Sequence, residues 1–260
     1  MQIMIYNPYP RVDLPFGNDN KYFQWLFEAL LKVKKRYLTY DVEFSSTSVD
    51  IKKEHLERVF AYELYHQWSV ILDQQKDNDL ILNAEIDKNI NETIIEMNKS
   101  DNDDSSESLR VNVYPDLVLH QSQGNDECQK MICEIKRSKI NDRNIITGSM
   151  IFGDLYKLSC YMNEERFSSK YKPFEYGIFI LSNGELNEIT NSLNPNVKII
   201  VSDKEYKFGE YIKEIKLVPI FEKIVCIAYN GTKIEYDTLD KLNEKIVKEY
   251  EKQKDKKQAC

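Results

Sequence analysis

The sequence predicts an α/β protein in which helices flank a mixed central β-sheet. Three observations lead to this fold class. Apolar residues recur at helical spacing in segments such as 20–38 and 51–73. Short runs such as 111–119 and 130–136 are rich in β-branched and aliphatic residues and have the length of strands. From residue 51 to residue 181 these segments follow one another in the order helix, strand, strand, strand, helix, strand, which is typical of a sheet covered by helices.

The expected helices contain apolar stripes and two candidate capping signals. Asp19 is a candidate N-cap for the first helix, and Thr47 with Asp50 three residues later resembles a capping box before the second. The last helix is rich in lysine and glutamate, and its apolar residues could dock on the body of the protein or on a partner. The expected helices cover residues 20–38, 51–73, 148–162 and 238–257.

The expected strands are bounded by polar segments and by turn signals. The stretch 121–127 contains a central glycine and predicts a β-hairpin between the strands on either side of it. Asn230-Gly231 is a second hairpin signal, because this pair suits a two-residue turn that needs positive φ angles. The acidic, serine-rich segment 88–109 is expected to be a mobile loop. The expected strands cover residues 40–44, 80–86, 111–119, 130–136, 176–181, 197–201, 217–221, 225–229 and 232–236.

Length and composition indicate a folded protein with one substantial core. The chain has 260 residues, of which 42% are hydrophobic and 12% aromatic. Its net charge is −7 and its sequence pI is about 5.2, whereas nucleic-acid binders usually carry excess positive charge. Five scattered cysteines without metal-finger spacing suit a reducing compartment. With no signal-peptide pattern at the N-terminus and no apolar run long enough to span a bilayer, we expect a cytoplasmic protein without membrane contact.

Two acids and a lysine stand out in the expected hairpin of strands 111–119 and 130–136. Pro115-Asp116 lies in the first strand, and Glu134-Ile135-Lys136 lies in the second. Side chains two positions apart in a strand point to the same face, so Glu134 and Lys136 should lie together. Glu-x-Lys alone carries no weight, because it recurs at 205–207 and 214–216. The conjunction with Asp116 at hairpin distance predicts a site that captures a divalent cation and hydrolyses phosphodiesters.

This pattern resembles the PD-(D/E)xK superfamily of restriction-endonuclease-like nucleases, with Pro115-Asp116 as PD and Glu134-Ile135-Lys136 as (D/E)xK. The resemblance implies a restriction-endonuclease-like αβββαβ core at residues 47–183. Residues 1–46 would form an N-terminal extension packed on that core, and residues 184–260 a C-terminal extension of hairpin and helix. It also implies a hydrolase that uses magnesium to cleave nucleic acid, with DNA as the expected substrate.

The resemblance further implies a role for each residue that matches the motif. Asp116, Glu134, the carbonyl oxygen of Ile135 and a helix glutamate, Glu63, would surround Mg²⁺, for which Mn²⁺ could substitute. Asp116, Glu134, Lys136 and Glu63 would be catalytic, with Lys136 positioning water or stabilising the transition state. The residues expected to contact nucleic-acid phosphate are Lys157, Arg137, Lys139 and Arg143. A subset of the superfamily has Gln-x-x-x-Tyr on the helix that follows, where this chain has Lys157 and Tyr161.

An alternative interpretation is a catalytically inactive nuclease-like module for binding or assembly. The net charge of −7 and the acidic segment 100–108 favour this reading, while the complete Asp, Glu and Lys set favours the nuclease. The C-terminal helix offers a surface for a homodimer or for a partner protein. His66, which forms Glu-x-x-His with Glu63, is interpreted as structural, because a di-iron bundle needs two such motifs.

Overall fold

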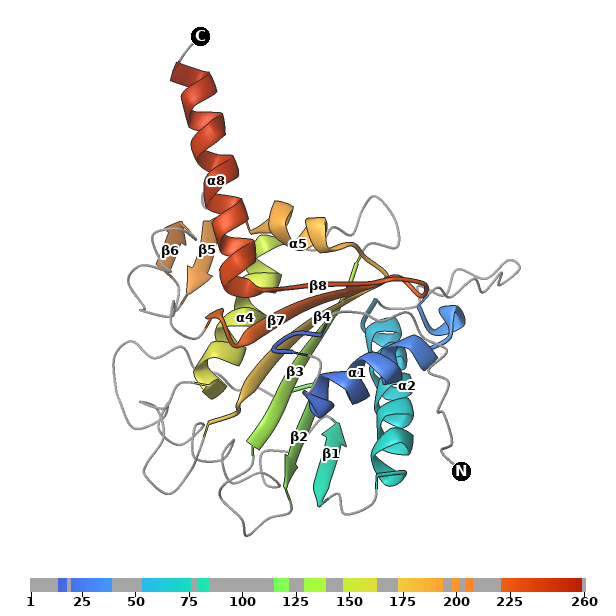
Figure 1. Ribbon diagram of the computed structural model, residues 1–260. Coiled ribbons are helices and arrows are strands. Elements are labelled where there is room, and N and C mark those ends of the chain that lie inside the picture. The colour runs from blue at the N-terminus through green and yellow to red at the C-terminus, as the bar shows by residue number, and fades with distance from the viewer. Residues whose placement is uncertain are drawn as a thin grey trace, which may run out of the picture.

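The computed structural model describes residues 14–17, 20–38, 53–75, 79–84, 115–121, 129–138, 147–162, 173–193, 198–201, 204–207 and 221–258. In this part of the chain a six-stranded sheet is flanked by helices, so the predicted mixed α/β class is confirmed. The strands are ordered β1-β2-β3-β4-β7-β8 across the sheet, which Figure 1 shows as a twisted layer through the middle of the molecule.

The sheet combines antiparallel and parallel pairs. Antiparallel pairing joins β1 to β2, β2 to β3 and β7 to β8, while β3, β4 and β7 run parallel to one another. The strands β7 and β8 extend the same sheet that contains β1 to β4, although the sequence places them in a C-terminal extension. The strands of the sheet are β1 (Leu80–Ala84), β2 (Leu117–Gln121), β3 (Gln129–Arg137), β4 (Tyr176–Ser182), β7 (Ile224–Tyr229) and β8 (Ile234–Thr238).

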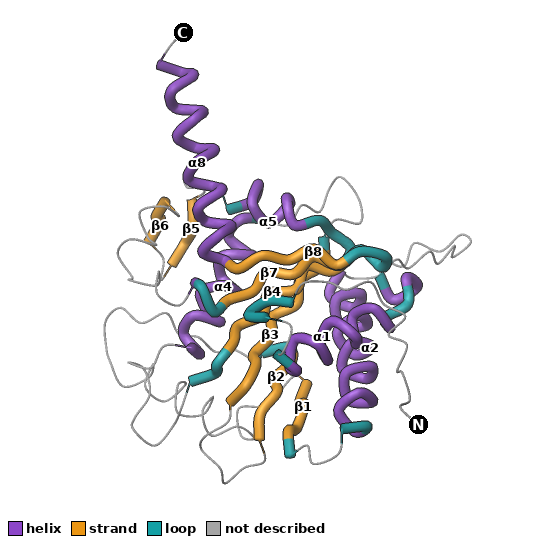
Figure 2. The backbone as a smooth tube through the Cα atoms, viewed as in Figure 1, coloured by secondary structure: helices purple, strands orange, loops and turns teal. Residues whose placement is uncertain are grey.

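Helices cover both faces of this sheet. Against one face pack α1 (Lys21–Lys32) and α2 (Lys53–Asp73), and the 3-10 turn η1 (Lys35–Tyr37) follows α1. Against the other face pack α4 (Gly148–Met162), α5 (Leu186–Ser192) and the start of α8 (Leu239–Gln258). Figures 1 and 2 show this division, with α8 running away from the body towards the C-terminus.

The alternation of strand side chains produces two separate cores. In β3, Met131, Cys133 and Ile135 join the core beneath α1 and α2. Ile132, between them in sequence, joins the core beneath α4, α5 and α8. By the same alternation, Glu134 and Lys136 belong to the α4 face of the sheet, as the sequence predicted for this pair. The buried acid of β3, Glu134, therefore lies next to α4.

The first helix begins one residue later than the capping signal suggested. Asn20 is the N-cap of α1, and its side-chain oxygen accepts hydrogen bonds from the backbone nitrogens of Tyr22 and Phe23. The Asn20 amide also donates to the Tyr176 hydroxyl at 3.3 Å, which ties the start of α1 to the start of β4. The predicted cap, Asp19, lies outside the described residues.

The C-terminal hairpin differs from its prediction in loop length. Tyr229 pairs with Ile234, so the loop between β7 and β8 has four residues where the sequence predicted two. The side chain of Asn230 accepts hydrogen bonds from the backbone nitrogens of Thr232 and Lys233, and Gly231 has a φ of 92°. Side-chain bonding by Asn230 therefore stabilises a longer turn than the tight Asn-Gly type.

Other differences concern short elements. No sequence pattern predicted α5, and the expected strand at 197–201 forms β5 (Lys198–Val201), which pairs with β6 (Lys204–Lys207) outside the main sheet. The expected strand at 40–44, the capping box of Thr47 and Asp50, the loop at 88–109 and residues 217–220 lie outside the described residues. Within the described ranges, no helix has the length and apolarity to cross a bilayer.

Candidate functional site

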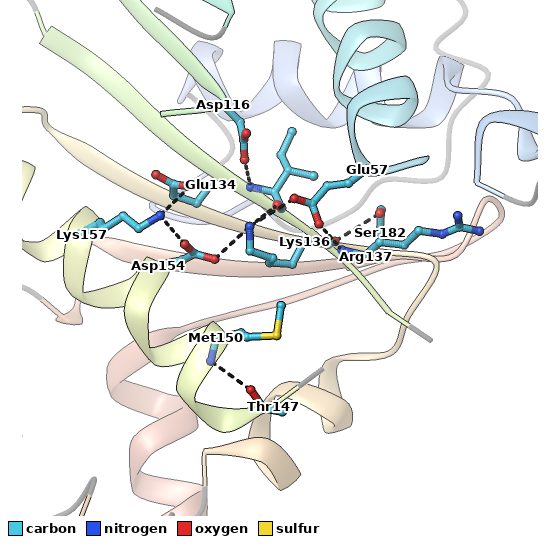
Figure 3. A network of polar contacts seen from close by, with 11 residues as sticks. Glu57, Asp116, Glu134, Lys136, Arg137, Thr147, Met150, Asp154, Lys157 and Ser182 are labelled. Carbon is cyan, nitrogen blue, oxygen red and sulfur yellow. Dashed lines mark hydrogen bonds and ion pairs between the residues drawn. The ribbon is translucent and has the colours of Figure 1, made fainter. Parts of the chain in front are cut away.

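The predicted acids and lysine come together where β3 ends, between the start of β2 and the α4 helix (Figure 3). β2 begins at Leu117, so within the described residues the edge of β3 beyond Cys133 has no strand partner on that side. Two carboxylates take the place of that partner. The backbone nitrogen of Ile135 donates to Asp116 Oδ2 at 2.6 Å, and that of Arg137 donates to Glu57 Oε2 at 3.3 Å.

Asp116 lies in the bend before β2 and not within the strand, as the sequence had suggested. Its backbone nitrogen donates to the Cys133 carbonyl at 3.1 Å, while its side chain bonds Ile135. Burial raises the pKa of Asp116 to about 6, and the hydrogen bond from Ile135 and the nearby ammonium of Lys136 only partly offset that effect. The Asp116 carboxylate is therefore fixed in place, but its negative charge is only partly stabilised by its neighbours.

Glu134 is 2% exposed and is the most deeply buried acid of the site. Its Oε2 atom lies 3.6 Å from Lys157 Nζ, whereas Oε1 has no hydrogen-bond partner within the described residues. Burial, then the neighbouring charge of Asp154, raises the pKa of Glu134 well above its ordinary value, and Lys157 opposes the shift. A buried carboxylate oxygen without a hydrogen-bond partner is costly, so Glu134 Oε1 is free to accept a proton or an added donor.

Lys136 is held by carboxylates on two sides, as Figure 3 shows. Its Nζ atom lies 3.2 Å from Glu57 Oε1 and 3.3 Å from Asp154 Oδ2, and it donates to the Ile135 carbonyl at 3.3 Å. Burial alone would lower the pKa of Lys136, but the surrounding carboxylates raise it above its ordinary value. Lys136 is thus a fixed cation, and the Ile135 carbonyl expected to face the metal is occupied by this ammonium.

Two residues of the site, Asp154 and Glu57, were not predicted from the sequence. Asp154 of α4 is 3% exposed, and its Oδ1 atom lies 2.6 Å from Lys157 Nζ, so it joins both lysines of the site. Its spacing of three from Lys157 on the predicted helix is a signal that could have identified it. Glu57 lies near the start of α2, where the sequence offers no feature that separates it from the other glutamates of that helix.

The structure brings Glu57, and not Glu63, to the site. These two glutamates are six residues apart on α2, which corresponds to about 240° around an α-helix, so they project from different faces. Glu63 accepts a hydrogen bond at 2.8 Å from the Gln67 side chain one turn further along, and none of its described contacts reaches Asp116, Glu134 or Lys136. The structure therefore places a glutamate of α2 beside Lys136, at position 57 and not at position 63.

Of the four residues expected to contact phosphate, the structure places one at the site and one away from it. Lys157 lies at the site, paired with Glu134 and Asp154. Arg137 does not, because its side chain is 4% exposed and donates to the Leu38 carbonyl in the core beneath α1 and α2. The alternation of β3 sends Arg137 to the face opposite Lys136, which excludes it as a phosphate ligand in this arrangement. Lys139 and Arg143 lie outside the described residues.

The charges of the site do not balance. Four carboxylates, from Glu57, Asp116, Glu134 and Asp154, surround two ammonium groups, from Lys136 and Lys157. With all six groups ionised, the formal charge is −2. Desolvation is the main cause of the raised pKa values of Asp116 and Glu134, and the neighbouring carboxylates add to it. A divalent cation would neutralise this excess.

The donor set fits a lightly coordinated magnesium ion. Asp116 and Glu134 each commit one oxygen to a donor of the protein and have a second oxygen without one within the described ranges. Mg²⁺ commonly uses one or two carboxylates and keeps several waters. Across the described part of the chain, no group of three or more His, Cys, Asp or Glu is arranged to hold a metal ion. The residues therefore suit an ion that substrate and water help to bind, and not an all-protein cage.

Comparisons of this chain with protein-family models, with curated proteins and with solved structures found no match.

Proposed function

We propose that this protein is a metal-dependent nuclease that hydrolyses phosphodiester bonds, with DNA as its substrate. One observation carries the proposal: the half-buried Asp116 and the buried Glu134 have raised pKa values beside the fixed ammonium of Lys136, and Glu134 Oε1 has no partner within the described residues. Sites with strongly perturbed acids and a specific charge partner are characteristic of catalysis. The order α2-β1-β2-β3-α4-β4 also matches the αβββαβ core of the PD-(D/E)xK superfamily, which the motif resembles.

In this proposal the acids hold Mg²⁺, or Mn²⁺ in its place, through Asp116 and Glu134. Such an ion polarises the phosphoryl oxygen and lowers the pKa of bound water towards neutrality. Lys136 orients the attacking water and stabilises the negative charge that develops on the phosphoryl group. Glu57 and Asp154 hold the Lys136 ammonium in place, and Lys157 neutralises Glu134 and offers a contact to the phosphate backbone.

The test is cleavage of nucleic acid by the purified full-length protein. Supercoiled plasmid, linear duplex, single-stranded DNA and RNA are incubated with Mg²⁺, Mn²⁺, Ca²⁺ or EDTA. Cleavage is expected with Mg²⁺ or Mn²⁺ and should be lost in both Glu134→Gln and Lys136→Ala. Glu28→Gln removes a carboxylate paired with Lys32 on α1 and serves as the matched control, which should cleave normally. Cleavage that survives in Glu134→Gln or Lys136→Ala would contradict the assigned site.

An inactive nuclease-like module for binding or assembly is the second candidate. The observation in its favour is that both acids already lie near lysines, and that the described residues hold no group of three metal-ligand side chains. This candidate predicts no turnover with any cation and a stable protein partner. Cation-dependent cleavage that follows Asp116 and Glu134 would eliminate it.

The proposal includes a cytoplasmic location and an assembly surface on α8. Buried unpaired thiols at Cys133 and Cys226 suit a reducing compartment. The first part of α8 buries Leu239, Leu242 and Ile246, while Val247 is exposed. Light scattering of the purified protein, with and without residues 247–260, tests whether this helix supports a homodimer.

A further inference from the structure

Asp154 occupies a position that the motif does not explain. It projects from α4 into the gap between α4 and β3 and is 3% exposed. One oxygen lies 2.6 Å from Lys157 Nζ on the same helix, and the other lies 3.3 Å from Lys136 Nζ on the strand. The second contact lacks the alignment of a hydrogen bond, so Asp154 Oδ2 acts on Lys136 mainly through charge.

We propose that Asp154 is a positioning residue, which holds the ammonium groups of Lys136 and Lys157 where they act on the phosphodiester. The inference rests on the proposed nuclease function. A lysine has a flexible four-carbon side chain, and both lysines here are only partly buried. Glu57 restrains Lys136 from the side of α2, and Asp154 restrains it from the side of α4. Without Asp154, the described structure restrains Lys136 from one side only.

An ordinary helix ion pair does not account for this arrangement. Exposed pairs such as Lys248–Glu244 on α8 contribute little, because solvent screens them. Asp154 is buried, faces two cations from two elements, and adds a negative charge beside Glu134, whose charge is already unfavourable there. A residue selected for stability alone would not increase the negative charge of a buried acidic site.

The charge of Asp154 gives the proposal a distinctive kinetic signature. Asp154→Asn keeps the shape of the side chain and removes one negative charge from a site that must accept phosphate. Binding of uncut DNA in Ca²⁺ is therefore expected to be unchanged or tighter. Single-turnover cleavage in Mg²⁺ is expected to slow by about tenfold to a hundredfold, the range typical for residues that orient a catalytic group. A residue with a merely structural role would weaken both.

The second readout is independent of cleavage and of metal. Amine-reactive labelling of the metal-free protein, followed by mass spectrometry, reports how firmly each lysine is held. In Asp154→Asn, labelling of Lys136 and Lys157 should rise several-fold, while the well-exposed Lys233 serves as the internal reference. Glu28→Gln is the matched control and should change the labelling of neither Lys136 nor Lys157.

These outcomes separate failure of the inference from failure of the proposed function. If the native protein cleaves no nucleic acid but labelling rises as expected, Asp154 restrains the two lysines as inferred, and the nuclease proposal fails together with the role towards the phosphodiester. If cleavage and labelling in Asp154→Asn equal those of the native protein, the positioning role is overturned. Should Asp154→Asn fail to fold, Asp154→Glu displaces the carboxylate by one methylene, and unchanged cleavage and labelling in that variant would also overturn the inference.

Discussion

The carboxylate of Asp116 replaces a strand partner for Ile135, accepting the hydrogen bond of its backbone nitrogen at 2.6 Å. This contact fixes the acid of the Pro-Asp pair against the Glu-x-Lys segment without using both of its oxygens. The unpaired backbone nitrogen of Ile135 on β3 thus positions the Asp116 carboxylate. The same edge also places Glu57, through the backbone nitrogen of Arg137.

The stability of the metal-free protein should depend on pH through Asp116. Its pKa is about 6 in the folded protein and 3.8 as the ordinary value, so the folded state binds the proton more tightly. The resulting stabilisation is complete below about pH 4 and is lost as the pH rises through 6, an effect of up to roughly 3 kcal/mol. Urea unfolding of the native protein and of Asp116→Asn in EDTA, from pH 5 to pH 8, measures this term.

Asp116→Asn should flatten that pH dependence and should be the more stable protein at pH 8 in EDTA. Added Mg²⁺ should stabilise the native protein at pH 8 and leave the variant unchanged, because the ion compensates the charge that the variant lacks. Equal slopes for the two proteins would show that Asp116 does not titrate in this range.

Replacement of Glu57 should impair catalysis more than replacement of Glu63. Glu57→Gln removes a charge that holds Lys136 at 3.2 Å, so cleavage should slow by roughly tenfold to a hundredfold. Glu63→Gln, on the same helix, keeps an acceptor for Gln67 and removes only a charge away from the site, so it should cleave at close to the native rate. Single-turnover rates of both variants in Mg²⁺ provide the comparison, and the reverse order would restore the role that the sequence suggested for Glu63.

Two glycines should respond oppositely to alanine. At Gly184, an added Cβ would lie 2.7 Å from Ser138 Cβ and 2.8 Å from Leu181 Cδ2, so Gly184→Ala should destabilise by about 1–3 kcal/mol. At Gly153, within α4, nothing lies within 4 Å, so Gly153→Ala should stabilise by roughly 0.5–1 kcal/mol. Urea denaturation of both variants gives the free energies, and a shared sign would contradict the packing around Gly184.

Removal of the cap of α1 should weaken the protein measurably. Asn20→Ala loses the bonds to the backbone nitrogens of Tyr22 and Phe23 as well as the bond to Tyr176, at a cost of about 1 kcal/mol or more. Asn191→Ala, at an exposed position of α5, is the matched control and should have little effect. Thermal and urea unfolding distinguish the two, and equal effects would remove the capping role.

Helices and strands with strong apolar periodicity could be predicted from the sequence, because their buried faces follow that periodicity in the folded protein. The 148–162 helix matches α4, and the run around Glu134 matches β3. The shorter α5 could not be read in this way. Its seven residues include one fully buried apolar residue, Ile189, and its capping box uses Glu185 where serine or threonine is usual. In α5, where the apolar periodicity is weak, the capping side chains of Glu185 and Glu188 define the start of the helix.

The sequence motif predicts only the part of the candidate site that lies on the β2–β3 pair. Asp116, Glu134 and Lys136 are neighbours in one hairpin, so pairing alone brings them together. Glu57 and Asp154 reach the site from helices on opposite faces of the sheet, and their placement depends on how α2 and α4 pack. A sequence pattern does not fix which face of α2 points at the end of β3, and Glu57 and Glu63 lie on different faces of that helix.

The acids that gather at the end of β3 come from sequence positions as far apart as 57 and 154. The strand β4, which pairs with β3 beside them, follows later in the chain. A chain emerging from the ribosome therefore contains no working centre until more than half of it has been synthesised. Premature termination before α4 leaves a product without Asp154 or Lys157. If the proposed nuclease function holds, truncated products of this kind lack the lysines and acids of α4 and are expected not to cleave nucleic acid.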